Sequence, residues 1–190
     1  HSRNPIRKLY DWMLSWAESP YALAALFVFS FAEASFFPIP PDILLIPMCL
    51  GAARKGFKCA LVCSVASVLG GLLGYGIGMA AWGELSGVFF DYVPGFSPEK
   101  FEHVKSLYSE HGILIVFTAG FSPIPYKLFT ITSGVMDLAL GPFLLASAVS
   151  RSLRFFIVAG LIYRFGEPIC DLIYRYFNIL ALGFSLFLVG

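Results

Sequence analysis

Long apolar stretches alternate with short polar ones along this chain, and the apolar stretches set its expected helices. A run of roughly 20 apolar residues crosses the hydrocarbon core of a bilayer as a helix. Mean hydropathy is +0.78, and only 13% of the residues are charged, about half the share in a typical globular domain. The pattern therefore predicts an all-α integral membrane protein, with residues 1–190 forming one polytopic domain.

The apolar and polar stretches divide this domain into seven segments. They are an amphipathic N-terminal helix over 5–18, a broken apolar hairpin over 21–53, a transmembrane helix over 59–82, an extracytoplasmic amphipathic segment over 83–112, a second broken hairpin over 113–140, and transmembrane helices over 142–163 and 168–190. The N-terminal helix either lies in the headgroup layer or packs on the protein surface, because its apolar positions follow one helical face.

Two Pro-Ile-Pro sequences interrupt the hairpin segments. The first lies in Phe36-Phe37-Pro38-Ile39-Pro40-Pro41-Asp42 and the second in Phe121-Ser122-Pro123-Ile124-Pro125-Tyr126-Lys127. Proline removes a backbone donor and breaks a helix, and the backbone groups it frees are tolerated at membrane depth only where protein or water satisfies them. Matching breaks in two halves are typical of transporters that build a midplane site from interrupted helices. The predicted break residues are Pro38, Pro40, Pro41, Pro123 and Pro125.

The basic residues predict how these segments enter the membrane. Clusters at Arg3–Lys8 and Arg54–Lys58 flank the first broken segment on both sides. Because positive loops favour the cytoplasmic side, a re-entrant hairpin that enters and leaves from the cytoplasm fits better than a single crossing. The second hairpin then enters from outside, which gives two opposed hairpins and an inverted repeat. A multi-pass protein of the inner (cytoplasmic) cell membrane is expected.

Ionisable side chains inside the apolar segments are the first candidates for function, since charge at that depth is costly. Alignment of the two breaks places Asp42 opposite Lys127 and predicts an ion pair between them. Glu33 and Asp42 are candidates for proton coupling. The candidates for ion pairing or for holding a substrate phosphate are Lys127, Asp137, Arg151 and Arg154. The planar guanidinium group of arginine matches the oxygens of a phosphate. A salt-bridge network that only fixes the hairpins is the alternative. The predicted cluster has three acids and three bases: Glu33, Asp42, Asp137, Lys127, Arg151 and Arg154.

The small residues predict packing rather than chemistry. Gly70, Gly74 and Gly78 recur at every fourth position of one span, a spacing that lets another helix approach closely. No histidine or further cysteine completes a metal set around the cysteines, so no metal site and no cofactor are expected. The four cysteines are predicted to be small buried hydrophobic residues: Cys49, Cys59, Cys63 and Cys170.

Charge and motif content exclude two classes of function. A net charge of +1 lacks the basic patch of a nucleic-acid binder, so nucleic acid is not an expected partner. No histidine lies within an apolar segment, and Cys59 and Cys63 have no neighbouring base. The chain is therefore not expected to be an enzyme.

The charged and proline-containing motifs carry a family resemblance. Glu33 with the run from Phe36 to Asp42 resembles the acidic first motif of the DedA membrane family, the SNARE-associated or VTT-domain family, most closely its YqaA-like branch. The run from Gly120 to Lys127 resembles the second motif and is followed by a glycine-containing stretch. It departs from the commoner family pattern, in which arginines flank the proline. The resemblance covers about residues 20–165.

This resemblance implies opposed re-entrant hairpins and lipid movement across the bilayer, with undecaprenyl phosphate or phosphatidylethanolamine as cargo and dependence on the proton motive force. The expected function is a lipid translocase, flippase-like or scramblase-like, whose partners are phosphate-headed membrane lipids and, where the transport is proton-coupled, protons. Two alternatives stay open. One is an ion or small-solute transporter on the same architecture, and the other is a non-catalytic membrane scaffold or assembly factor that docks through the glycine ridge. A homo-oligomer is compatible with all three.

Overall fold

The computed structural model describes residues 15, 19–35, 41–51, 53–92, 98–122, 126–166, 168–169, 172 and 175. The described residues contain no strand, which confirms the all-α class for this part of the chain. The predicted N-terminal helix and final span lie almost wholly outside the described residues. The helices are α2 (Ala22–Ser35), α3 (Asp42–Gly51), α4 (Ala53–Tyr92), α5 (Pro98–Phe121), α6 (Tyr126–Val135) and α7 (Leu140–Phe165).

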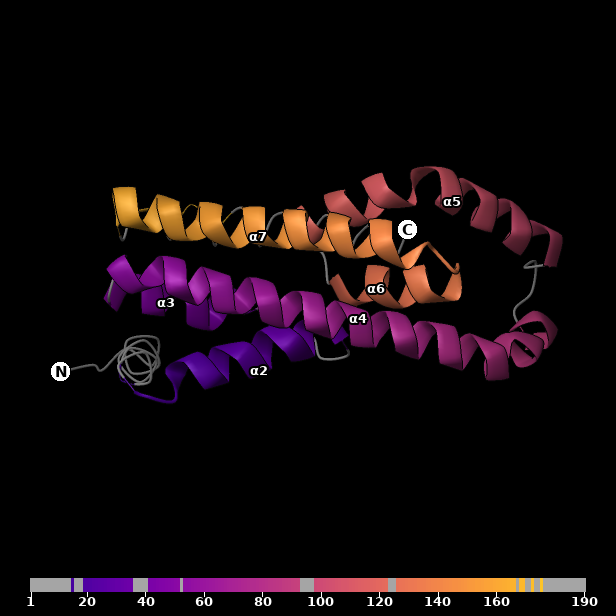
Figure 1. The fold of residues 1–190 in the computed structure, drawn as a ribbon, viewed down its shortest axis with the longest axis horizontal. Helices are drawn as coiled ribbons and strands as arrows, with labels where there is room; N and C mark the ends of the chain where they lie inside the picture. The colour runs from indigo at the N-terminus through magenta and orange to yellow at the C-terminus, as the bar shows by residue number, and fades with distance from the viewer. Residues whose placement is uncertain are drawn as a thin grey trace.

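Two long helices, α4 and α7, run side by side in opposite directions along the long axis of the molecule (Figure 1). Helix α2 packs along α4, and α5 packs along α7. The short helix α3 packs against both long helices near the start of α4, whereas α6 packs mainly on α4 further along it (Figure 1). The chain therefore shows the same order twice, namely an arm, a break, a short helix and a long helix.

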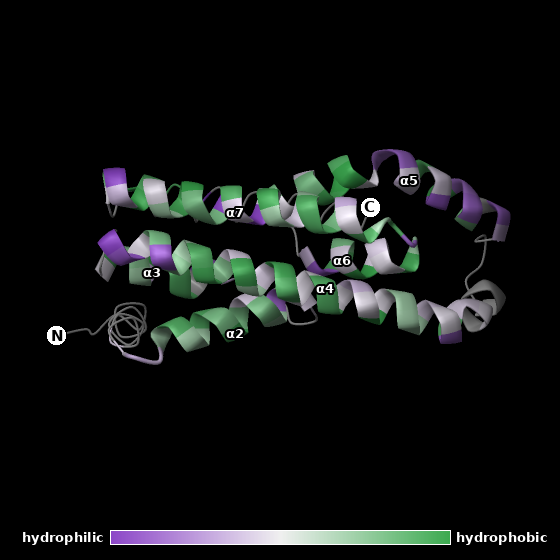
Figure 2. Cartoon of the chain, in the orientation of Figure 1, coloured by the Kyte–Doolittle hydropathy of each residue, from purple (hydrophilic) through white to green (hydrophobic). Residues whose placement is uncertain are grey.

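Helices α4 and α7 are long and apolar enough to cross a membrane by length and composition. Much of both ribbons is green, the colour of apolar residues (Figure 2), and many of these residues are exposed. A soluble protein rarely exposes apolar residues in such continuous rows. These rows therefore fit contact with lipid. The exposed residues include Leu61, Val65, Leu69 and Leu72 on α4, and Leu145, Val149, Leu153 and Ile157 on α7.

Helices α4 and α5 extend beyond the predicted segments. The basic residues Arg54–Lys58 form the first turns of α4, and α4 continues past residue 82 to Tyr92. Helix α5 runs unbroken through the boundary predicted at 112–113. The reason is that a change of polarity marks where a helix leaves lipid, and a helix satisfies its own backbone groups on both sides of that surface.

A polar layer separates two apolar cores. One core joins α2, α3 and the early part of α4 to the end of α7, and it includes Leu26, Ile46, Cys63 and Phe155. The other joins α5 and α6 to the start of α7, with Val116 and Phe143 among its members. Between the two cores lie buried polar and charged side chains from the middle of the molecule. The polar layer comprises Glu33, Ser35, Asp42, Ser64, Ser67, Thr130, Ser147, Ser150, Arg151 and Arg154.

The glycine ridge of α4, from Gly70 to Gly78, lies where α2 and α6 cross it. Side chains on its three glycines would collide, in order, with the carbonyl of Phe31, the hydroxyl of Thr130 and the carbonyl of Ile131. The absence of a Cβ therefore allows α2 and α6 to approach the backbone of α4 closely. Because the chain's own helices occupy this ridge, it is not the free docking face that the scaffold alternative requires.

Candidate functional site

The polar layer gathers the ends of the broken helices around the middle of α7. Glu33 lies near the end of α2, and Asp42 is the first residue of α3. Ser122 directly follows α5, and Tyr126 begins α6. Glu33, Asp42 and Tyr126 are buried, so the unpaired backbone groups of these helix ends need partners inside the protein.

The first ion pair joins Arg151 to Glu33. The Arg151 Nη2 atom lies 2.6 Å from Oε2 of Glu33, and its Nε donates to the Ser67 hydroxyl at 2.6 Å. Arg151 is fully buried, and the rings of Tyr126 and Phe155 each lie 4.8 Å from its Cζ. Charge-assisted hydrogen bonds and two aromatic faces therefore hold this guanidinium in place.

The second ion pair joins Arg154 to Asp42. The Arg154 Nη2 atom lies 2.5 Å from Oδ2 of Asp42, and its Nη1 donates to the backbone carbonyl of Ser122 at 2.8 Å. Residues three apart lie on one face of a helix, so α7 presents Arg151 and Arg154 to the same polar layer. Both acids come from the first half of the chain and both arginines come from the second.

Each of these contacts also complements a helix dipole. The backbone N–H of Tyr126 donates to Oε1 of Glu33 at 3.3 Å, so the carboxylate faces the positive N-terminal end of α6. Arg154 binds a carbonyl at the C-terminal end of α5, where the dipole is negative. Asp42 stands in the first turn of α3. Glu33 thus complements a helix end of the opposite half, whereas Arg154 and Asp42 complement helix ends of their own halves.

Buried atoms of the ion-paired residues keep unused hydrogen-bonding capacity. Within the described part of the chain, Oδ1 of Asp42 has no donor and Nη1 of Arg151 has no acceptor. A buried polar atom without a partner is costly, so each such atom needs an explanation. Together they offer one acceptor and one donor to a ligand that carries both an anionic oxygen and an N–H or O–H group.

Hydroxyl groups connect the polar layer to the second core. The Tyr126 hydroxyl hydrogen-bonds to Ser147, and the Thr130 hydroxyl donates to the carbonyl of Ala34 at 2.9 Å. Ser35 donates to the carbonyl of Gly70 at 2.9 Å. The sequence reasoning did not single out Ser67, Tyr126 or Ser147. Small hydroxyl residues on inward faces of apolar helices were the signal that could have identified them.

The ion pair predicted between Asp42 and Lys127 is wrong, because the partner of Asp42 is Arg154. The two halves do not place α3 against α6 as the alignment assumed. Helix α3 packs against α4 and α7, whereas α6 packs against α2, α4 and α5. Lys127 is half-buried in the first turn of α6, beside Tyr126.

The placement of Asp137 in the charged cluster is also wrong. It is exposed in the turn after α6, with a φ of 55° in the left-handed region. The ten residues of α6 carry it about 15 Å from the start of that helix. An exposed aspartate with this backbone conformation is typical of a helix end, since aspartate tolerates the left-handed region better than most residues.

The remaining predicted residues fall into two groups. Cys49, Cys59 and Cys63 are buried, and no metal-binding group of His, Cys, Asp or Glu occurs among the described residues. Pro41 is buried, and its carbonyl accepts from the N–H groups of the first turn of α3. The other four break prolines, and Cys170, lie outside the described residues.

The chain was compared with protein families, curated proteins and solved structures. The VTT domain family model matches residues 39–164. An uncharacterized protein of Haemophilus influenzae is 42% identical over 159 residues, which cover 84% of this chain and 81% of that protein. An uncharacterized homolog in Histophilus somni is 43% identical over 158 residues, which cover 80% of this chain and 78% of that protein. No solved structure matches.

Proposed function

Because the chain belongs to the VTT-domain (DedA) family of membrane proteins, we propose that it moves phosphate-headed lipids between the leaflets of the inner membrane. The observation that carries this proposal is the polar layer with its two buried arginines near the middle of α7, a helix long enough to span the bilayer. Intramembrane charges are costly and are retained mainly along substrate or ion pathways. Undecaprenyl phosphate and phosphatidylethanolamine are the cargoes proposed.

The unused hydrogen-bonding atoms fit such headgroups. A phosphate oxygen can accept from Nη1 of Arg151, which lacks an acceptor among the described residues. Oδ1 of Asp42 can accept from the ammonium group of phosphatidylethanolamine or from the O–H of a singly protonated prenyl phosphate. One acceptor and one donor thus complement both cargo classes. The headgroup would bind without any covalent step, so we propose a transporter rather than an enzyme.

The broken helices supply the proposed path. Helices α3 and α6 have 10 residues each, or about 15 Å, which is too short to cross the hydrocarbon core. We therefore place α2–α3 and α5–α6 in the membrane as two re-entrant hairpins, entering from opposite sides as an inverted repeat. Their broken ends meet at the ion pairs, where the headgroup would pass while its tails stay in lipid.

In this proposal Glu33 is the residue that couples lipid transport to protons. Its carboxylate holds Arg151 at 2.6 Å, and a phosphate group would compete for the same guanidinium. A proton taken up by Glu33 removes the competing charge and releases Arg151 to the headgroup. Loss of that proton restores the ion pair and expels the cargo. The cycle needs only one carboxylate that changes charge beside a fixed cation.

The proposal is tested by lipid flipping in liposomes that contain the purified protein, with and without an inward proton gradient. Glu33→Gln keeps an acceptor for the Tyr126 N–H and loses the titratable group, so we expect folded protein with flipping reduced to the protein-free rate. The matched control is Glu84→Gln, since Glu84 is exposed on α4, and it should flip lipid normally.

Full activity of the Glu33→Gln protein would contradict the proton-coupling role. A folded protein that flips neither phosphatidylethanolamine nor a prenyl phosphate would contradict the translocase function and favour transport of a small solute. Flipping that needs Glu33 but ignores the gradient would leave the translocase in place as a scramblase.

A further inference from the structure

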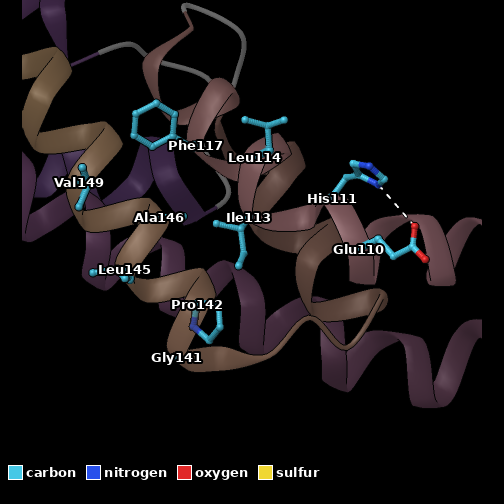
Figure 3. A pocket seen from close by; sticks show the side chains of 10 residues that line it. All are labelled: Glu110, His111, Ile113, Leu114, Phe117, Gly141, Pro142, Leu145, Ala146 and Val149. Atoms are coloured by element: carbon cyan, nitrogen blue, oxygen red, sulfur yellow. Dashed lines mark ion pairs between the residues drawn. The ribbon is translucent and has the colours of Figure 1, made fainter.

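A groove of about 810 Å³ lies between α5 and α7, outside the ion-pair site. Figure 3 shows that α5 contributes Ile113, Leu114 and Phe117 to its lining and that α7 contributes Leu145 and Val149. Among the described residues its lining is apolar except at one end, where Glu110 and His111 form the rim. The His111 Nδ1 atom lies 3.9 Å from a Glu110 carboxylate oxygen, and both side chains are largely exposed.

The polar rim coincides with the level at which α5 changes character. Residues of α5 before Gly112 are largely polar, whereas those after it are apolar (Figure 2). The same end of the groove is lined by Gly141 and Pro142, which belong to the first turn of α7. Since α7 can span the membrane, its first turn marks the membrane surface. The groove therefore starts at that surface and descends into the apolar region.

Two further hollows lie beside this groove. A neighbouring hollow of about 320 Å³ shares Leu114 with it and is lined at its far end by Ser122. The carbonyl of Ser122 accepts the hydrogen bond from Arg154. A second hollow, of about 520 Å³, shares Val149 and follows α7 to Phe156. These hollows follow α5 and α7 from the level of Glu110 to the level of the second ion pair.

We propose that this groove binds one hydrocarbon tail of a membrane lipid whose head lies beside Glu110 and His111. A volume of this size is typical of ligand sites, and its polarity matches an amphiphile, with one hydrated polar end and an otherwise apolar length. Leu114 is 64% exposed and Leu145 is 68% exposed. These two side chains face the surroundings of the protein on the two sides of the groove. In a membrane those surroundings are lipid chains, whereas a second protein copy would need a surface that fills the hollow.

The inference rests on the proposed function in one respect only, namely that the bound lipid is a transport substrate that later moves to Arg154. Binding itself requires no transport, so the two can fail separately. The groove would then serve as the loading site for lipids of the leaflet that contains the start of α7.

The test uses the full-length protein in vesicles that contain phosphatidylethanolamine with a photoreactive group in one acyl chain. After illumination, adducts are mapped on the protein by mass spectrometry. We expect a several-fold excess of adducts at Leu114, Leu145 and Val149 over Leu61 and Val65, which are comparably exposed on α4 but lie outside the groove. Equal labelling of both sets would indicate ordinary surrounding lipid and would overturn the proposal.

A matched pair of variants on α7 sharpens the test. An added Cβ meets nothing within 4 Å at Gly141, which lines the groove, or at Gly160, which does not. Gly141→Phe should remove most of the groove adducts, while Gly160→Phe should leave them unchanged. Unchanged labelling in Gly141→Phe, or protein–protein crosslinks at Leu145 in place of lipid adducts, would contradict tail binding. Flipping without groove labelling would overturn the groove alone, and groove labelling without flipping would overturn only its role in transport.

Discussion

The α2–α3–α4 half and the α5–α6–α7 half have the same order of elements, yet their charges are different. The first half contributes Glu33 and Asp42 to the polar layer, and the second contributes Arg151 and Arg154. Both ion pairs therefore cross from one half to the other, and neither lies within a half. The repetition of the backbone creates the broken ends, while the asymmetry of the side chains fixes one half against the other.

The two ion pairs themselves differ in how completely they are enclosed. Arg151 has no exposed surface and lies between two aromatic rings, with Ser67 as a further partner. Arg154 is slightly exposed and holds the carbonyl of Ser122 at the end of α5. The first pair thus has the stronger structural role, and the second lies next to Ser122, which lines one of the apolar hollows.

Arg151→Met is expected to have the largest effect, because it leaves the carboxylate of Glu33 buried without its cation. Loss of one partner of a buried ion pair costs on the order of 3–5 kcal/mol. Arg154→Met should cost less, since its surroundings are less enclosed. Thermal unfolding of the purified proteins in detergent measures both changes.

The double variant Glu33→Gln with Arg151→Met separates pairing from packing. It should be more stable than Arg151→Met alone, since no unpaired charge stays buried. Strictly additive losses in the double variant would show that the two side chains act independently, contrary to the ion pair in the structure.

Gly70→Val should have an intermediate effect, because its side chain would collide with the backbone carbonyl of Phe31 and push α2 away from α4. Overpacking of this kind typically costs about 1–3 kcal/mol. Gly76→Val is the matched control on the same helix, since a Cβ there meets nothing within 4 Å. The unfolding temperatures of the two variants are compared, and equal values would refute close packing at Gly70.

Thr130→Val should have the smallest effect, at about 1 kcal/mol. The change removes a hydroxyl that donates to the carbonyl of Ala34 across the halves and keeps the shape of the side chain. In the control, Thr118→Val, the lost hydroxyl bonds only to Leu114 within α5 and is exposed. Stability in chemical denaturant should therefore fall for Thr130→Val and stay within about 0.5 kcal/mol for Thr118→Val.

The sequence predicted the helical class, the two breaks and the burial of Glu33, Arg151 and Arg154, because apolar runs, proline and charge within an apolar segment each carry a strong local signal. It did not predict the partners of the charges. Partner choice depends on which short helix packs against α7, and that contact joins residues 112 apart in the case of Asp42 and Arg154. Alignment of the two breaks supplied a false partner because it assumed that symmetric positions meet.

Helix boundaries were less predictable for a related reason. Polarity along the sequence reports the environment of each turn, so it located where α4 and α5 leave the apolar region. It did not report that each helix continues beyond that level. A serine within an apolar helix, such as Ser67, signals a buried polar position, but the sequence does not show which charged residue it contacts.

The long separation within each ion pair has a consequence for biosynthesis. Glu33 precedes Arg151 by 118 residues, so at common translation rates its partner is made roughly 6–24 s later. During that interval α2, α3 and α4 exist with two uncompensated carboxylates. The first half is therefore a poor candidate for independent insertion into lipid, and it would be held in a wet or chaperoned environment until α7 emerges. Chains that end before α7 should be recognised as defective by membrane quality control, because Glu33 and Asp42 lack their arginine partners in such chains.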